Sequence, residues 1–505
     1  MPSVVYGATL AGVDAVRVGV EVDLLRRLPQ VVMVGLPAPS VRESADRVRS
    51  AIVASGFEFP RQRVVVALAP ADLRKDGTAF DLPIAVGILV EARQVKSSRA
   101  ARYLFVGELS LSGELRPVRG TLAFAWLARA EGFAGVIVPA ACGPEAALVE
   151  GIEVRAASTL AEVAAFLDEK GELPIAVPRE CGPPAFAADL RDLRGQAGAR
   201  EALEVAAAGG HNLFLEGPPG CGKTMLAARL PTILPRMTLV EALECTRIHS
   251  VAGLHAPDAG ALTVRPFRAP HHSISAAGLV GGASLRPGEV TLAHNGVLFL
   301  DEFPEFPRGA REVLRGPLED RRVVLARASG RVVLPAAFSL IAAANPCPCG
   351  NHGHPTRPCV CPEAARERYR ARLSGPLIDR IDLRIELLPI RPADLLGDAE
   401  GETSAAVRER VERARERQRA RYGDTATCNA EVRAEQVQEA AQAESSALAL
   451  LQTHLEVGSG SARVGRRLLK VARTLADLEG DPRVRIRHVA RAIGLRCDVD
   501  ERGAS

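Results

Sequence analysis

The sequence is poor in aromatic residues, in lysine and in net charge. Aromatic residues make up 4% of the 505 residues, with one tryptophan, so few flat side chains are available for stacking against bases. Lysine is also scarce, with five lysines among 64 basic residues. The formal net charge of +4 is small for this length, which excludes a uniformly basic surface. Any basic surface must therefore be local.

Long apolar runs and a disulfide pattern are missing too. No run of 18 apolar residues occurs, and the first twenty residues lack the basic and apolar regions of a signal peptide. We therefore expect a cytoplasmic protein without membrane contact. Ten cysteines are few for this length, and four of them lie between Cys347 and Cys361. This density favours a metal site in a reducing compartment over a disulfide framework.

The chain divides into three predicted parts. Residues 1–170 alternate short β-branched runs with alanine-rich helical patterns, which is typical of an α/β domain. Residues 171–189 contain four prolines and are interpreted as a linker. Residues 190–392 show strand-like runs separated by helical segments, a parallel α/β pattern. Residues 393–505 keep helical spacing with hardly any β-branched run, so we expect an all-helical domain.

A phosphate-binding loop follows the apolar run Leu213 to Glu216. The segment GPPGCGKT matches the pattern G-x-x-x-x-G-K-[ST] between a strand and a helix. Its backbone N–H groups can surround phosphates, and the N-terminus of the following helix favours negative charge. Lys223 is expected to reach the β and γ oxygens, and the Thr224 hydroxyl to bind Mg²⁺. The predicted nucleotide-binding residues are Gly217, Pro218, Pro219, Gly220, Cys221, Gly222, Lys223 and Thr224.

A second apolar run, Val297 to Leu300, ends in two acidic residues. This is the arrangement of a Walker B segment, in which Asp301 would hold the magnesium shell and Glu302 would orient and polarise the attacking water. The alternative is a buried strand that ends in a solvated acidic turn. Together with the phosphate loop, the segment favours ATP hydrolysis over binding alone. The predicted cofactors are ATP and Mg²⁺.

Three further residues are candidates for the hydrolysis site. The apolar run Leu340 to Ala344 ends in Asn345, where AAA+ proteins carry the sensor 1 residue that helps to place the water. The segment around Arg380 resembles the one that, in ring ATPases, projects an arginine into the neighbouring subunit's nucleotide. Arg463 resembles the sensor 2 arginine of the lid. For both arginines the alternative is an ordinary surface position.

The four clustered cysteines form two C-x-C pairs. Cys347 and Cys349 are separated by nine residues from Cys359 and Cys361, within a predicted insertion at 346–362. Four thiolates complete a tetrahedral zinc site and leave no open position, so the predicted zinc is structural. Free thiols in a surface loop are the alternative. Two histidines inside the loop, His352 and His354, are competing ligands.

Two segments are candidate contact loops. Residues Arg321 to Pro335 have the pattern of a hairpin with a turn at 328–330. In related ring ATPases a hairpin before sensor 1 enters the central channel, so Arg327 and Arg331 are candidates for contact with a DNA backbone; a solvent-facing hairpin is the alternative. The pair His271-His272 is a second contact loop. As a metal site it is weaker, because no carboxylate lies at ligand spacing nearby in the sequence.

Longer segments match one family. They are RPFRAPHHS at 265–273, VGG at 280–282, RPGE at 286–289, LAHNGVLFLDE at 292–302 and NPCPCG at 345–350. With them, the chain resembles the YifB/ComM family of magnesium-chelatase-like AAA+ ATPases over its whole length. The resemblance implies an AAA+ P-loop core with a parallel sheet, a C-terminal helical lid of the magnesium-chelatase type and a homo-oligomeric, hexameric ring. It also implies a DNA helicase that drives branch migration in recombination during natural transformation.

A different function remains open. A magnesium-chelatase motor subunit, acting on a separate protein or porphyrin-binding partner, would share the same motor modules. The N-terminal domain favours the DNA motor, because chelatase motor subunits usually begin at the AAA+ module.

The first 170 residues are similar to the Lon protease domain. The landmarks are LRKDG at 73–77, FVGEL at 105–109 and GELRPV at 113–118. Protease chemistry in that fold requires a serine and a lysine, and the landmarks place these positions at Ala79 and Leu122. Neither side chain can perform the reaction. We therefore expect a non-proteolytic scaffold or DNA-contacting module, which weakens a third interpretation as an ATP-dependent protease or unfoldase.

Overall fold

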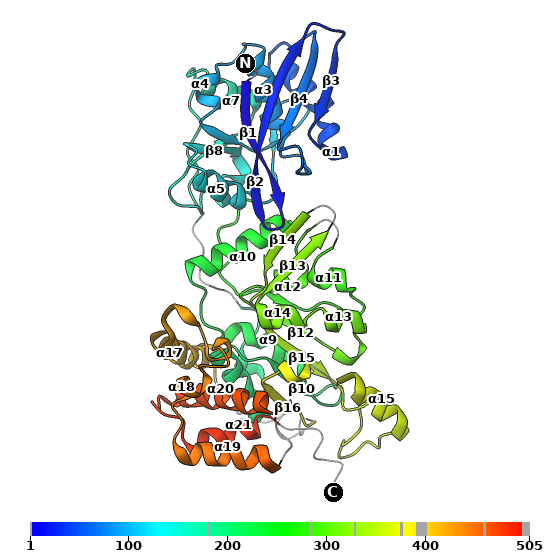
Figure 1. The fold of residues 1–505 in the computed structure, drawn as a ribbon, viewed down its shortest axis with the longest axis vertical. Coiled ribbons are helices and arrows are strands. Elements are labelled where there is room, and N and C mark those ends of the chain that lie inside the picture. Colours follow the sequence, from blue (N-terminus) through cyan, green and yellow to red (C-terminus); the bar gives the residue numbers. More distant parts are fainter. Residues whose placement is uncertain are drawn as a thin grey trace.

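The computed structural model describes residues 3–179, 182, 184, 186–282, 285–327, 330–373, 377–389, 401–457 and 461–496. Along its long axis the chain forms an N-terminal α/β part, a central part with a parallel sheet, and a C-terminal helical part (Figure 1). No helix among these residues is long and apolar enough to span a bilayer.

The N-terminal part contains a seven-stranded sheet with strand order β3-β4-β2-β1-β5-β8-β9. Its strands are β1 Ser3–Ala11, β2 Asp14–Leu25, β3 Gln30–Val34, β4 Arg63–Ala69, β5 Tyr103–Phe105, β6 Glu108–Leu109, β7 Leu115–Arg116, β8 Gly135–Pro139 and β9 Glu153–Ala157; β6 and β7 pair separately. Its helices are α1 Pro39–Arg42, α2 Ser44–Ala54, α3 Asp81–Glu91, α4 Ser97–Ala100, α5 Thr121–Ala130, α6 Gly143–Ala146 and α7 Leu160–Leu167. Alternate residues of β2, from Val18 to Val22, are buried, as period-two patterning requires.

The positions predicted for a protease dyad lie in one apolar cluster. Leu122 is fully buried in this cluster, and Ala79 packs against it. Both positions therefore carry hydrocarbon side chains, and neither side chain is a nucleophile or a base.

The central part is built on a five-stranded parallel sheet with strand order β11-β12-β15-β10-β16. The strands are β10 Leu213–Glu216, β11 Phe267–Arg268, β12 Val297–Leu300, β15 Ser339–Ala344 and β16 Leu383–Glu386, with the separate hairpin β13 Arg322–Arg327 and β14 Gly330–Pro335. The helices are α8 Ala197–Gly209, α9 Lys223–Ile233, α10 Leu239–Ala252, α11 Ala276–Val280, α12 Glu289–Leu292, α13 Arg308–Glu312, α14 Arg315–Asp320 and α15 Glu363–Leu373. All of β12 is buried, as expected of a parallel strand covered on both faces.

The strand order explains where the site forms. β15 pairs with β12 on one side and with β10 on the other. Because parallel strands end at the same edge of a sheet, the residues that follow these three strands lie close together. The predicted mixed α/β fold with a parallel sheet is confirmed.

The C-terminal part, within 401–457 and 461–496, consists of helices and contains no β-strand. The helices are α17 Ser404–Tyr422, α18 Val437–Ala441, α19 Ser445–Val457, α20 Ala462–Glu479 and α21 Ile486–Gly494. α20 forms the centre of this part and packs on α17, α18 and α21. Within α20, the fully buried Arg473 pairs with the equally buried Asp477 at 3.1 Å.

The N-terminal part is packed directly against the central part. The Ser250 hydroxyl of α10 donates to the buried Glu145 carboxylate at 2.5 Å and accepts from the backbone N–H of Gly120 at 2.9 Å. Nearby, Arg247 pairs with Asp14 at 2.7 Å. These contacts join segments that are more than 100 residues apart in the chain, so the two parts share an interface as well as a covalent connection.

Candidate nucleotide site

The phosphate loop leaves β10 and turns directly into α9. Gly220 and Gly222 have φ angles of +82° and +93°, a region that glycine enters without steric cost. This turn lets α9 begin at Lys223, with its N-terminus facing back along the loop. The loop is also tied to the neighbouring strand, because the Gly217 N–H donates to the Ala344 carbonyl at 3.2 Å. The geometry is that of an anion-binding helix N-terminus.

Lys223 lies inside the loop that it is predicted to serve. Its Nζ donates to the carbonyls of Gly217 at 2.7 Å and Pro218 at 3.0 Å, and to Asn345 Oδ1 at 3.0 Å. Burial lowers the pKa of Lys223 below its ordinary value, and the nearby Cys221, Asp301 and Glu302 offset only part of this shift. The ammonium is therefore held at the loop by acceptors that phosphate oxygens can replace. The structure brings Asn345, the predicted sensor 1 residue, to this ammonium.

Thr224 and Asp301 lie within hydrogen-bond distance. The Thr224 hydroxyl donates to Asp301 Oδ2 at 2.8 Å. A hydroxyl and a carboxylate are the oxygen ligands that Mg²⁺ takes beside nucleotide phosphates. The residues present therefore fit a magnesium–nucleotide complex, in which Thr224 and Asp301 would hold Mg²⁺. Bound Mg²⁺ would neutralise phosphate charge.

Glu302 has a partner that sequence reasoning missed. Glu302 adopts a φ of +52°, and its carboxylate lies 3.0 Å from His272 Nδ1. The His272 ring also packs against the His271 ring in a tilted arrangement, with ring centroids 4.0 Å apart. No carboxylate lies at ligand spacing from this histidine pair in the sequence, but Glu302 lies beside it in space. The order of the strands could have predicted this contact. The histidines follow β11, and the acidic pair follows β12, which is the parallel neighbour of β11.

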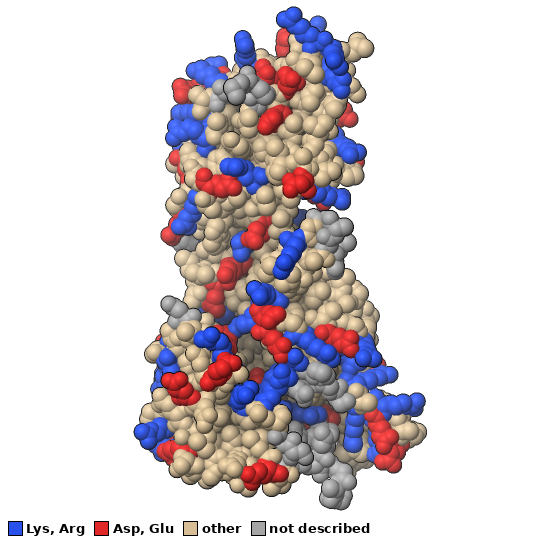
Figure 2. Space-filling model, in the orientation of Figure 1, with Lys and Arg blue, Asp and Glu red and all other residues tan. Residues whose placement is uncertain are grey.

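The two predicted arginines lie together, but not at the phosphate loop. Arg380 pairs with Glu319 at 2.6 Å, and Arg463 lies 3.7 Å from the same carboxylate oxygen. Both arginines line a cavity of about 980 Å³ between the central and C-terminal parts, and no residue of 217–224 lines it. Figure 2 shows the hollow on the face in view, with acidic and basic side chains at its rim. The candidate hydrolysis residues therefore form two groups at separate places.

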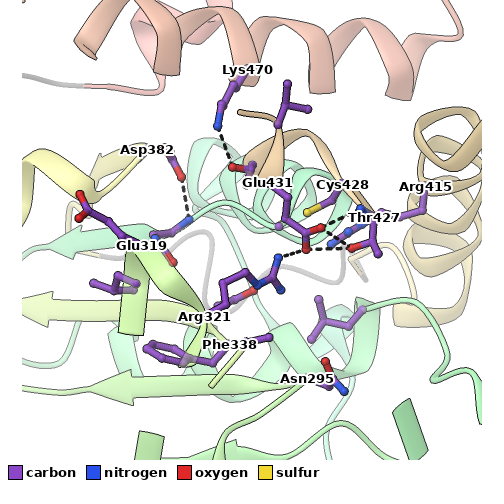
Figure 3. A pocket seen from close by; sticks show the side chains of 18 of the residues that line it. Asn295, Glu319, Arg321, Phe338, Asp382, Arg415, Thr427, Cys428, Glu431 and Lys470 are labelled. Carbon is purple, nitrogen blue, oxygen red and sulfur yellow. Dashed lines mark hydrogen bonds and ion pairs between the residues drawn. The ribbon is translucent and has the colours of Figure 1, made fainter. Parts of the chain in front are cut away.

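Basic side chains dominate this cavity. They are Arg236, Arg265, Arg321, Arg380, Arg415, Arg419, Arg433, Arg463, Arg466, Arg467 and Lys470. The acidic lining residues are Glu241, Glu244, Glu319, Asp382 and Glu431. Figure 3 shows Arg321 reaching Glu431 across the cavity. Lys470 Nζ donates to the Ala430 carbonyl at 2.8 Å. This lining is suited to binding either a strongly anionic ligand or the charged surface of a protein.

Asp382 anchors one wall of the cavity. It lies 3.5 Å from His211 and 3.4 Å from Arg467. Burial by itself would raise the pKa of Asp382, but His211, Arg467 and Lys470 outweigh it and lower this pKa to about 2. The ionised carboxylate therefore stabilises the fold above its unfolded pKa of 3.8, and this contribution is lost as the pH falls through about 2.

Replacing Asp382 with asparagine is expected to lower the free energy of unfolding at pH 7 by about 2 kcal/mol, since each unit of pKa shift corresponds to about 1.4 kcal/mol. The deficit should shrink between pH 4 and pH 2, where the wild-type carboxylate takes up its proton. Denaturant unfolding followed by circular dichroism measures this difference. The exposed Asp320→Asn is the matched control. A deficit that stays constant down to pH 2 contradicts the assignment.

The hairpin β13–β14 is confirmed. Its exposed face carries Arg331, which lies opposite Ala326 in the strand register. Val324 and Val333 lie on the same face, with exposed fractions of 47% and 48%. Residues 328 and 329 of the predicted turn and the side chain of Arg327 lie outside the described residues. Arg331 therefore faces solvent, where it is open to a ligand.

The four sulfur atoms of the cysteine cluster (Cys347, Cys349, Cys359 and Cys361) lie within 4.8 Å of one another. The two histidines of the loop are engaged elsewhere. His352 lies between Arg366 and Arg370 of α15, at 3.1 Å from each, and His354 Nδ1 accepts from the backbone of Thr356. The candidate metal site therefore consists of the cysteines alone.

Family models match most of the chain. The model described as magnesium chelatase, subunit ChlI, matches residues 189–395. A second, described as subunit ChlI of Mg-chelatase, matches residues 20–142, and the ChlI C-terminal model matches residues 401–496. Because the N-terminal match carries the same description as the others, the N-terminal part alone does not separate a DNA motor from a chelatase motor.

Curated relatives match over nearly their full length. The chain is 42% identical to the competence protein ComM of Haemophilus influenzae over 505 residues, covering 98% of each chain. It is 41% identical to the uncharacterized protein YifB of Escherichia coli, covering 98% of this chain and 97% of the relative. An uncharacterized protein of Mycobacterium tuberculosis is 44% identical, with 97% and 98% covered. The chain therefore belongs to the YifB/ComM family of magnesium-chelatase-like AAA+ ATPases.

Proposed function

We propose that this protein is an ATP-dependent DNA motor, a ring-forming helicase that promotes branch migration in recombination during natural transformation. The observation that carries the proposal is the division of the hydrolysis residues into two groups. Lys223, Asp301 and Glu302 lie around the phosphate loop, whereas Arg380 and Arg463 lie at the charged cavity. An arginine that stabilises transition-state charge must reach a nucleotide, so a second subunit has to supply one.

A closed ring lets each subunit use both groups. In a homo-oligomer with head-to-tail contacts, the cavity of one subunit meets the phosphate loop of the next. The basic lining then faces the triphosphate of the neighbouring subunit. Arg380 and Arg463 would leave Glu319 in order to contact this triphosphate. A hexamer is the proposed state.

DNA is the proposed substrate because of the hairpin and the relatives. Arg331 is exposed on β14, and an arginine at such a position can bind backbone phosphates without reading sequence. A relative that is 42% identical is named for competence. With few aromatic residues to stack on bases, the contact should depend strongly on salt.

The proposed cofactors are ATP and Mg²⁺ at the phosphate loop and structural zinc at the cysteine cluster. The proposed boundaries are residues 1–170 for a non-proteolytic Lon-like domain, 171–189 for a linker, 190–392 for the AAA+ core with its insertion at 346–362, and 393–505 for the lid. A cytoplasmic location is proposed with them. The N-terminal domain would act as a scaffold or as a further DNA contact.

ATP hydrolysis by the purified protein should rise several-fold with single-stranded or forked DNA. Lys223→Ala and Glu302→Gln should abolish both the basal and the stimulated rate. Arg331→Ala should weaken the apparent DNA affinity and reduce the slope of its salt dependence by about one, because one phosphate contact is lost. The rate of phosphate release at several salt concentrations measures these effects.

Arg413→Ala, at an exposed arginine of α17 that pairs with Glu409, is the matched control and should leave the DNA response unchanged. A basal ATPase that is indifferent to every DNA tested contradicts the DNA substrate. It would bring forward the second candidate, a magnesium-chelatase-type motor acting on a protein or porphyrin-binding partner, which the descriptions of the three family models favour.

A further inference from the structure

The spacing of the sulfur atoms in the cysteine cluster matches one metal ion. Cys347 Sγ lies 3.4 Å from Cys349 Sγ and 3.6 Å from Cys359 Sγ, and the last two sulfurs are also 3.6 Å apart. Four thiolates at a Zn–S distance of about 2.3 Å form a tetrahedron with edges of about 3.8 Å. A disulfide would require about 2.05 Å. The arrangement therefore suits four thiolates around a central ion.

Backbone groups support the sulfurs from outside. The N–H of Cys349 donates to Cys361 Sγ at 3.3 Å, and the N–H of His352 donates to Cys347 Sγ at 3.3 Å. Such bonds orient the ligands of a structural metal and stabilise negative charge on the thiolates. Cys347 is fully buried, and the other three cysteines are half-buried. The loop thus has a closed structural site without an open coordination position.

The cysteine cluster adjoins the phosphate loop. A Cβ built on Gly350 would lie 2.5 Å from Pro219 Cδ and 2.8 Å from its Cγ. The loop that carries the four cysteines, residues 347–361, which we call the knuckle, is therefore in direct contact with the phosphate loop. Just before the cluster, Asn345 Oδ1 accepts from Lys223 Nζ at 3.0 Å. The segment 344–350 therefore contacts the phosphate loop at three points. The Ala344 carbonyl accepts from Gly217, Gly350 packs against Pro219, and Asn345 accepts from Lys223.

We propose that the cysteine cluster binds one structural Zn²⁺, and that the zinc-filled knuckle braces the phosphate loop in its nucleotide-binding shape. The brace rests on the proposed function, since it assumes that ATP binds at this loop, whereas zinc binding does not. Without the ion, no bond links the four free cysteines, and the knuckle can open. Pro219 then loses its support, and the loop spends less time in the conformation that binds phosphate.

The test begins with the full chain, purified without oxygen and without chelator. Elemental analysis should find about one zinc per chain in the wild type and close to none in Cys359→Ser. Cys142→Ala, which changes a buried cysteine of the N-terminal part, should leave the zinc content unchanged. Zinc far below one per chain in the wild type would overturn the metal site.

The brace is tested with two glycine variants. Gly350 and Gly353 have φ angles of +78° and +76°, but a Cβ meets Pro219 only at Gly350 and meets nothing at Gly353. Both alanines therefore carry the same backbone strain. Gly350→Ala should keep its zinc and bind a fluorescent ATP analogue roughly tenfold more weakly, while Gly353→Ala should bind normally.

Cys359→Ser, and wild type treated with a zinc-selective chelator, should show the same roughly tenfold loss. Equal affinities for Gly350→Ala and Gly353→Ala would overturn the brace, even with zinc present. If the zinc-loaded wild type binds no nucleotide at all, with Lys223→Ala as the baseline, the proposed ATPase site fails and the brace fails with it. The measured zinc content still decides the metal site.

Discussion

Arg380→Ala is expected to lower kcat for ATP hydrolysis by about 10³-fold, with ATP binding at the subunit's own loop little changed. An arginine that stabilises the charge on the transferred phosphoryl group contributes about 10³ to 10⁵ in rate. Arg380 lies at the cavity beside Glu319, and no phosphate-loop residue lines that cavity. The loss should therefore appear in the chemical step at a neighbouring subunit. Steady-state hydrolysis and nucleotide binding measure the two effects separately.

Mixing variants distinguishes action between subunits from action within one. Lys223→Ala and Arg380→Ala are each expected to be inactive alone. In a mixed ring, some interfaces join an intact phosphate loop from the Arg380→Ala subunit to an intact Arg380 from the Lys223→Ala subunit. Activity should therefore return on mixing, to a fraction of the wild-type rate. A mixture as inactive as its components, while size measurements show mixed rings, contradicts a shared site.

Glu302→Gln is expected to lower kcat by about 10² to 10⁴-fold, the usual contribution of a positioned general base. Amide and carboxylate have nearly the same shape, so ATP and Mg²⁺ should still bind. The variant should therefore trap the nucleotide without hydrolysing it. Single-turnover hydrolysis, together with binding of a fluorescent ATP analogue, measures this separation.

Glu305→Gln is the matched control. Glu305 lies one turn further along the chain and pairs with Arg372 at 3.2 Å, with half of its side chain exposed. An exposed ion pair of this kind contributes little, so hydrolysis should be close to wild type. The assignment of Glu302 fails if both variants lose activity equally, or if Glu302→Gln hydrolyses ATP normally.

Sequence patterns pointed to the candidate nucleotide site because its residues follow apolar strands. Gly217, Asp301 and Asn345 each come directly after a strand of the parallel sheet. Strand-end residues of a parallel sheet meet at one edge, so linear spacing was enough. The predicted hairpin at 321–335 was found from another local pattern, two β-branched runs separated by a turn that contains glycine.

The missed contacts depend on which distant segments pack together. Glu319 lies on a short helix far in sequence from Arg463, and nothing local marks it as the partner of both arginines. The contact between Gly350 and Pro219 joins two loops over 130 residues apart. Side-chain partners of this kind follow from tertiary packing, which periodicity does not describe. The contact between His272 and Glu302 was also missed, although it follows from the pairing of β11 with β12.

The junction between the N-terminal and central parts has a consequence for dissecting the chain. Val13, in the turn between β1 and β2, is fully buried in the core of the central part, and Gly12 contacts Leu334 of the hairpin. A truncated protein that begins after the linker would therefore lose a piece of its own interior. Its hairpin would be left with an apolar side open to water and prone to association. Internal substitutions, rather than deletion, are the way to separate the two parts genetically.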